Sequence, residues 1–123
     1  MVHRFVAWGA ILAGLGVAAG AFGAHGLKSI LSPDRLAVYE TAVRYHLYHA
    51  LAMVVVGCLG DRCRADRVGI AGRLFMVGIL LFSGSLYLLA LSGVRWLGAI
   101  TPLGGAAFLG GWATLAWAAM KRN

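Results

Sequence analysis

Residues 74–91 read LFMVGILLFSGSLYLLAL, eighteen consecutive residues without a charged side chain. As a helix, this stretch would be about 27 Å long, close to the ~30 Å hydrocarbon core of a bilayer. Inside lipid every backbone N–H and C=O group has to be paired within the protein, which a single helix achieves by itself. The stretch is therefore predicted to be a transmembrane helix.

Three further apolar stretches have comparable lengths. Together with the first they predict four spans in one membrane domain, residues 1–123, with the spans at about 5–27, 36–60, 74–92 and 97–120. Ser32 and Pro33 suit the cap and the first position of a helix, so the second helix can begin as early as Pro33. Because the connections are short, consecutive helices should be antiparallel neighbours. The predicted fold is an all-α, four-span transmembrane helical bundle.

The composition agrees with this class. Hydrophobic residues make up 61% of the chain and charged residues 12%, against roughly 25% charged residues in soluble domains. A soluble protein of this size could not bury so much apolar surface. The first span is too long for the apolar core of a signal peptide and is expected to stay uncleaved. We expect a multi-pass protein of the cell inner (plasma) membrane, with membrane lipids as partners.

The net charge of +7 has a membrane explanation as well. Lysines and arginines cluster at span ends, and no basic stripe alternates with exposed aromatic residues, so we expect no nucleic-acid binding. Seven of them belong to the side that holds both termini and the second loop, namely Arg4, Arg62, Arg64, Arg67, Arg73, Lys121 and Arg122, against four on the other side. The positive-inside rule then predicts that both termini are cytoplasmic.

Small residues recur at spacings of three or four in the first and fourth spans. Such residues let helices approach closely in lipid, where packing drives association. The predicted packing positions are Gly16, Gly20, Gly23, Ser83, Gly84, Pro102, Gly104 and Gly105. These surfaces serve contacts within one chain or, as the alternative, a homo-oligomer or a larger membrane complex. Pro102 either kinks the fourth helix or stands at its start.

A polar cluster is predicted at the end of the bundle that holds the first and third loops. Glu40, Arg44 and Tyr48 follow one another at intervals of four on the second helix, so Glu40 and Arg44 are in register for an ion pair. The candidate ligand or ion-pair residues are His25, Glu40, Arg44, Tyr45, Tyr48, His49, Arg95 and Thr101.

Four interpretations of this cluster stay open at this point. It holds helices together; it carries protons or a solute, since intramembrane ionisable groups often mark a pathway; it ligates haem or a metal through His46 and His49; or it lines a pocket for a headgroup, a quinone or a small lipid. The sequence shows no nucleophile–base–orienter set, so we expect no enzyme, no catalytic residue, no metal and no cofactor.

Several blocks resemble a known family. The segments GAFGAHGLK, ETAVRYHLYHALA, LFSGSLYLLAL and LGAITPLGG are similar in kind and order to the small inner-membrane proteins of the YgdD/YwdK type, catalogued as domain of unknown function 423. The resemblance implies a four-span membrane protein and supplies no reaction. We expect a non-enzymatic accessory or scaffold protein that binds lipid or a membrane partner; the alternative is a small transporter or proton-conducting protein that uses the Glu/Arg/His cluster.

Overall fold

The computed structural model describes residues 2–60 and 62–120. Within them the chain forms helices only: α1 (Arg4–Phe22), the π-helical turn η1 (Gly23–Leu27), α2 (Pro33–Leu59), α3 (Ala65–Gly78), the π-helical turn η2 (Ile79–Ser83), α4 (Gly84–Ser92), the 3-10 turn η3 (Arg95–Ala99) and α5 (Thr101–Met120). These join into four rods, Arg4–Leu27, Pro33–Leu59, Ala65–Ser92 and Arg95–Met120, each long and apolar enough to cross a membrane. The predicted four-span all-α fold is confirmed.

The start of α2 follows the predicted cap. The Ser32 hydroxyl accepts a hydrogen bond from the backbone N–H of Arg35 at 3.3 Å, and Pro33 stands at the first helical position. At the other end of the chain, Pro102 lies in the first turn of α5, directly after η3. A proline there removes no intrahelical hydrogen bond, because the first N–H groups of a helix have no partner in it. Of the two interpretations of Pro102, the helix start is the one observed.

The third rod begins at Ala65, earlier than the predicted residue 74. Val68, Ala71 and Phe75 are buried on one side of α3, whereas Asp66 and Arg73 are exposed. This extension is amphipathic, and a prediction based on continuous hydrophobicity places its charged residues in a loop. Arg67 and Arg73 therefore belong to the helix, whereas Arg62 and Arg64 precede it.

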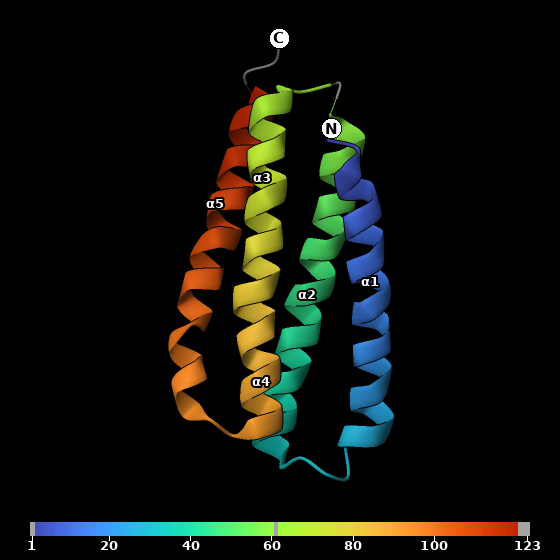
Figure 1. The fold of residues 1–123 in the computed structure, drawn as a ribbon, viewed down its shortest axis with the longest axis vertical. Helices are drawn as coiled ribbons and strands as arrows, with labels where there is room; N and C mark the ends of the chain where they lie inside the picture. The colour runs from blue at the N-terminus through green and yellow to red at the C-terminus, as the bar shows by residue number, and fades with distance from the viewer. Residues whose placement is uncertain (1, 61, 121–123) are drawn as a thin grey trace.

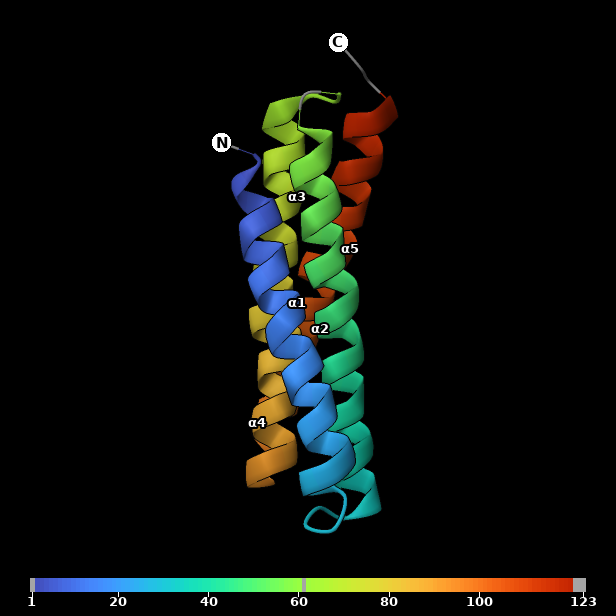
Figure 2. The same cartoon turned by 90° about the vertical axis from the view of Figure 1, so that its right-hand side faces the viewer.

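The rods are staggered, and their order in space follows the chain (Figures 1 and 2). The close backbone contacts are between α1 and α2, between α2 and the α3–η2–α4 rod, and between that rod and α5. Both termini and the α2–α3 connection lie at one end, called here the terminal end (Figure 1). Rods that are not neighbours in this order are separated by a third rod, and a groove lies between them: one between α1 and α3, another between α2 and α5.

The core lies along α2 and α3 and centres on Met53, Val56, Val68 and Phe75, all of which are fully buried. Many large apolar side chains on the outer surfaces are exposed instead, for example Val17 and Leu109. In a membrane, lipid tails cover such residues at no cost, so the inner face of each helix has to be specified by packing and hydrogen bonds.

Candidate functional site

His46 lies in the middle of α2 and is almost fully buried, with 6% of its surface exposed. Its Nε2 is 2.7 Å from the carbonyl oxygen of Leu12 on α1, and its Nδ1 is 2.8 Å from the hydroxyl of Tyr87 on α4. Because a carbonyl can only accept, Nε2 carries the proton, and in the neutral ring Nδ1 accepts from Tyr87. One imidazole thus joins three helices.

His49 lies one turn further along α2 and is 5% exposed. Its Nδ1 donates to the carbonyl oxygen of Tyr45 at 2.7 Å, and its Nε2 accepts from the indole N–H of Trp112 on α5 at 3.0 Å. The ring is stacked on Phe108, with centroids 3.5 Å apart. His49 is therefore protonated on Nδ1, whereas His46 is protonated on Nε2. All four ring nitrogens of the two histidines are hydrogen-bonded.

Tyr39 and Ser83 extend this polar layer on the inner face of α2. The Tyr39 hydroxyl donates to the carbonyl oxygen of Ala19 on α1 at 2.6 Å. The Tyr39 ring lies over Gly23, where an added Cβ would come within 2.6 Å of it. Ser83, at the end of the π-helical turn η2, is fully buried and donates to the carbonyl oxygen of Ala42 on α2 at 2.8 Å. Each bond ties α2 to a neighbouring rod.

The α4–α5 connection is held by a pair of hydroxyls. Ser85 and Thr101 are 2.6 Å apart. The Ser85 hydroxyl also bonds the carbonyl oxygen of Phe82. Thr101 therefore fixes the first turn of α5 against α4.

The predicted polar cluster divides in the structure. Tyr45 and His49 lie together at the α2–α5 contact, with their rings 6.2 Å apart. Glu40 and Arg44 are exposed side chains on α2 at a smaller cavity against α1. No ion pair joins them in the described residues, whereas Arg64 and Asp66 form one at 3.3 Å. His25 and Arg95 are exposed as well. The structure thus separates the formal charges from the buried histidines.

The predicted packing residues differ in how closely they are approached. An added Cβ would come within 2.6 Å of Leu47 at Gly16, but only within 3.3 Å of Val43 at Gly20 and 3.9 Å of Phe82 at Gly105. Gly104 is buried directly against the backbone of Phe82, whereas Gly84 has no close neighbour outside its own rod. Pro102 is exposed. At Gly9, another small residue of the first span, an added Cβ would lie 2.7 Å from the Ala50 carbonyl oxygen.

An aromatic groove opens between α2 and α5 and is called here the α2–α5 groove. Its volume is about 750 Å³. It is lined by Tyr45, Tyr48, His49, Phe82, Pro102, Gly105, Ala106, Phe108, Leu109 and Trp112. Its floor is the stack of Tyr45, His49 and Phe108, and its lining is mostly aromatic or apolar. A cavity of this size and character is typical of sites that bind an apolar ligand.

Comparison with known proteins places the chain in a family. The family described as "Protein of unknown function (DUF423)" matches residues 19–105. The chain belongs to the DUF423 family. Its relatives include the UPF0382 membrane protein YwdK of Bacillus subtilis (strain 168), 49% identical over 118 residues, which are 95% of this chain and 96% of the relative.

Two staphylococcal members are similarly close to this DUF423 chain. The UPF0382 membrane protein SH2409 of Staphylococcus haemolyticus is 45% identical, with 90% of each chain covered, and SERP0230 of Staphylococcus epidermidis is 46% identical, with 95% of each covered. No solved structure matches the chain. The resemblance to this family is confirmed, and the chain is a multi-pass membrane protein.

Several residues that shape this DUF423 site were not among the predicted ones. Arg35 is half-buried, and its Nε donates to the carbonyl oxygen of Ala90, near the end of α4, at 2.7 Å. Tyr39 and Trp112 supply the hydrogen bonds to Ala19 and His49 described above. His46, which the sequence offers as a haem or metal ligand, is hydrogen-bonded to Leu12 and Tyr87. The sequence carries one signal for them: Tyr39, His46 and His49 are spaced by seven and three residues, the spacing of one helix face.

Proposed function

We propose that this DUF423 protein is a non-enzymatic accessory protein of the plasma membrane that binds the hydrocarbon chain of a lipid in the α2–α5 groove. The observation that carries the proposal is the groove itself, with its stacked aromatic floor and its opening on the outer surface of the bundle. An acyl chain needs an apolar channel of this kind and few polar partners.

The extent of the groove supports a lipid chain. Its α5 wall runs from Pro102, in the first turn, to Trp112, near the middle of the helix. Ten residues of helix correspond to about 15 Å, which is half of a ~30 Å hydrocarbon core. The groove therefore has the depth of one leaflet, and a lipid of that leaflet can enter it without leaving its own layer.

The polar atoms of the groove also favour an amphipathic lipid. Both nitrogens of His49 are used within the protein. The hydroxyls of Tyr45 and Tyr48 have no hydrogen bond in the described residues, and both side chains are exposed. A phenolic hydroxyl with an unused hydrogen can donate to the ester carbonyl of a lipid. A ligand with many polar groups would find few partners here.

The buried polar groups argue against a conducting path. Tyr39, His46, His49, Ser83 and Ser85 are buried, and each is hydrogen-bonded within the protein. Arg67 has one buried nitrogen, Nη1, without a hydrogen bond in the described residues, and its guanidinium lies over the Trp117 ring. A proton or solute pathway needs groups that can exchange partners across the membrane. The observed bonds rather fix the helices in place, which suits a binding protein.

The test is photo-crosslinking in phosphatidylcholine liposomes that contain a diazirine-labelled acyl chain. Ala106 is exposed and lines the groove, whereas Ala113, two turns further along α5, is exposed and does not. We expect Ala106→Leu to lower labelling of Tyr45 and Tyr48 several-fold and Ala113→Leu to leave it unchanged. Equal labelling in the wild type and both variants, with matching thermal stability, would show that lipid does not occupy the groove.

A further inference from the structure

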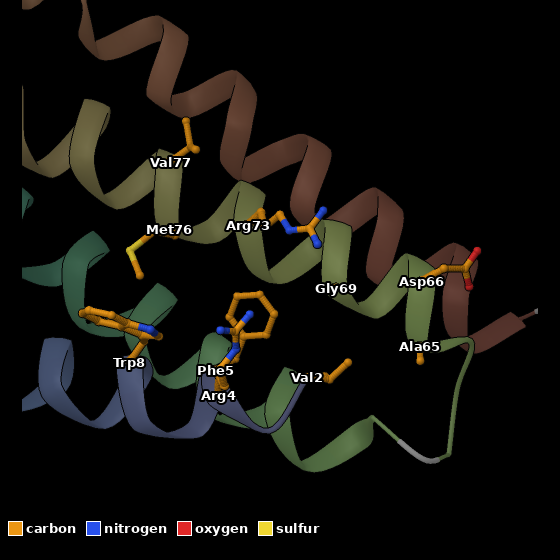
Figure 3. A pocket seen from close by; sticks show the side chains of 10 residues that line it. All are labelled: Val2, Arg4, Phe5, Trp8, Ala65, Asp66, Gly69, Arg73, Met76 and Val77. Atoms are coloured by element: carbon orange, nitrogen blue, oxygen red, sulfur yellow. The ribbon is translucent and has the colours of Figure 1, made fainter.

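Another large cavity lies on a different surface, at the terminal end, where α1 and α3 face each other across α2. Its volume is about 700 Å³. Figure 3 shows Phe5 and Trp8 on α1 facing Met76 on α3 across the opening, with Arg73 lying along α3 beside Gly69. We call this cavity the α1–α3 groove. It shares no lining residue with the α2–α5 groove.

The floor of the α1–α3 groove is apolar. The ring of Phe5 lies so close to Gly72 that an added Cβ would come within 2.7 Å of it, which brings α1 and α3 together at the bottom. Trp8, Met76 and Val77 line the part that extends towards the middle of the bundle. Trp8 and Val77 are more than 40% exposed. A hydrocarbon chain, and not a polar solute, fits such a wall.

The rim of the groove at the terminal end is cationic. Arg4 and Arg73 lie on opposite walls, and both side chains are exposed. The one carboxylate of the lining, Asp66, is paired with Arg64 at 3.3 Å and points away from Arg73 (Figure 3). Arg67 is not part of this rim, because its guanidinium lies 3.4 Å from the centre of the Trp117 ring on α5. The exposed guanidinium of Arg73 above an apolar channel complements a phosphate that carries an acyl chain.

We propose that the α1–α3 groove binds an anionic phospholipid, whose phosphate is bound by Arg73 and one of whose acyl chains follows Trp8, Met76 and Val77. The headgroup then lies at the level of the terminal end, and the chain extends towards the membrane centre. The two grooves open between different pairs of helices. The proposal does not depend on what occupies the α2–α5 groove.

Gly69 offers a way to close the groove without touching a charge. It lines the cavity, and an added Cβ would meet nothing within 4 Å. Gly14 on α1 has equally open surroundings but faces outwards and lines neither groove. Both Gly69→Leu and Gly14→Leu should preserve the fold, since leucine is the better helix former and meets no neighbour at Cβ.

The experiment measures retained lipid by native mass spectrometry after incubation with phosphatidylglycerol or, separately, phosphatidylcholine. We expect Gly69→Leu to lose the phosphatidylglycerol that the wild type and Gly14→Leu retain. Labelling of Tyr45 and Tyr48 by the diazirine lipid should be unchanged in Gly69→Leu, so failure of one lipid site does not imply failure of the other. Unchanged phosphatidylglycerol retention in a folded Gly69→Leu protein would overturn the proposal.

A charge variant identifies the headgroup contact. Arg73→Gln should weaken phosphatidylglycerol binding about fivefold, as expected for one arginine near an anionic lipid surface. Arg62→Gln removes the same charge from an exposed residue at the same end, outside the groove, and should have little effect. An equal loss in both variants would show a diffuse charge effect and overturn the assigned contact. Thermal stabilisation by soluble glycerol phosphate, equal to that by phosphatidylglycerol, would identify a free phosphate as the ligand and overturn the lipid assignment.

Discussion

Helix α2 presents two polar faces that behave in opposite ways. On the outer face, Glu40 and Arg44 are exposed, without an ion pair between them in the described residues. On the inner face, Tyr39, His46 and His49 are buried, and their polar atoms bond to other helices or to the α2 backbone. The sequence spacing predicts an ion pair between the charged residues Glu40 and Arg44. In the structure, the neutral side chains of Tyr39, His46 and His49 make the hydrogen bonds.

The cost of burial explains this division. A charged side chain at the centre of a bilayer costs about 2.5–3.5 kcal/mol on insertion scales. A neutral imidazole or phenol costs far less once each polar atom has a partner. A helix that is surrounded by other helices therefore keeps its ions outside and places hydrogen-bonded neutral groups inside. Four sets of substitutions test this difference between the faces of α2.

The largest effect is expected where the inner face of α2 meets the α1 backbone. A Cβ added at Gly9 would lie 2.7 Å from the Ala50 carbonyl oxygen and 2.9 Å from the backbone nitrogen of Val54, and a backbone cannot move aside as a side chain can. We expect Gly9→Ala to lower the free energy of unfolding by about 3 kcal/mol, measured by SDS-induced unfolding in mixed micelles. Gly14→Ala, with no neighbour within 4 Å, is the control. Equal stability of the two variants would contradict the helix contact described here.

Removal of His46 should come next in magnitude. His46→Leu abolishes two hydrogen bonds and leaves the Tyr87 hydroxyl without its partner. We expect a loss of about 1–2 kcal/mol in the same unfolding assay. Adding Tyr87→Phe removes the stranded hydroxyl, so the double variant should be less destabilised than the sum of the two single ones. Strict additivity would mean that the two side chains are not coupled.

Substitution of Arg35 should have an intermediate effect on stability, because its guanidinium is hydrogen-bonded within the protein. Its Nε donates to the Ala90 carbonyl oxygen near the end of α4, where a positive charge is favourable. Arg35→Gln is expected to lower the unfolding free energy by about 1 kcal/mol. Arg95→Gln, at an exposed position, should change little. A larger effect at Arg95 than at Arg35 would reverse this assignment.

Substitutions on the outer face of α2 should change the free energy of unfolding least. Because Glu40 and Arg44 are exposed and form no ion pair in the structure, Glu40→Gln and Arg44→Gln should each change stability by no more than about 0.5 kcal/mol. Their coupling energy in a double-mutant cycle should be close to zero. A coupling of about 1 kcal/mol or more would restore the ion pair that the sequence spacing predicts.

The four spans and the start of α2 could be predicted because they depend on local sequence. Continuous hydrophobicity sets the length of a span, and Ser32 followed by Pro33 is a cap signal that needs no tertiary contact. The extension of α3 to Ala65 escaped prediction because its charged residues occupy only one side of the helix, a pattern hidden by averaging along the chain.

The partners of the histidines could not be predicted, for a different reason. His46 bonds to Leu12 and His49 bonds to Trp112, so the partners belong to different helices and are far away in the sequence. Which carbonyl or indole meets an imidazole depends on the rotation and crossing of two helices, and those follow from the packing of many residues. Spacing along α2 predicts which residues share a face, but not which face is buried.

The agreement between chain order and spatial order also bears on how the protein is made. Each rod packs mainly against the rod synthesised just before or after it (Figure 1). A nascent chain can therefore insert α1 and α2 as a ready pair and add each later helix to a surface that is already present. Short sequence separation between contacting segments favours rapid assembly. Each helix can pack against its partner soon after both are synthesised. The incomplete protein is therefore exposed to proteases only briefly.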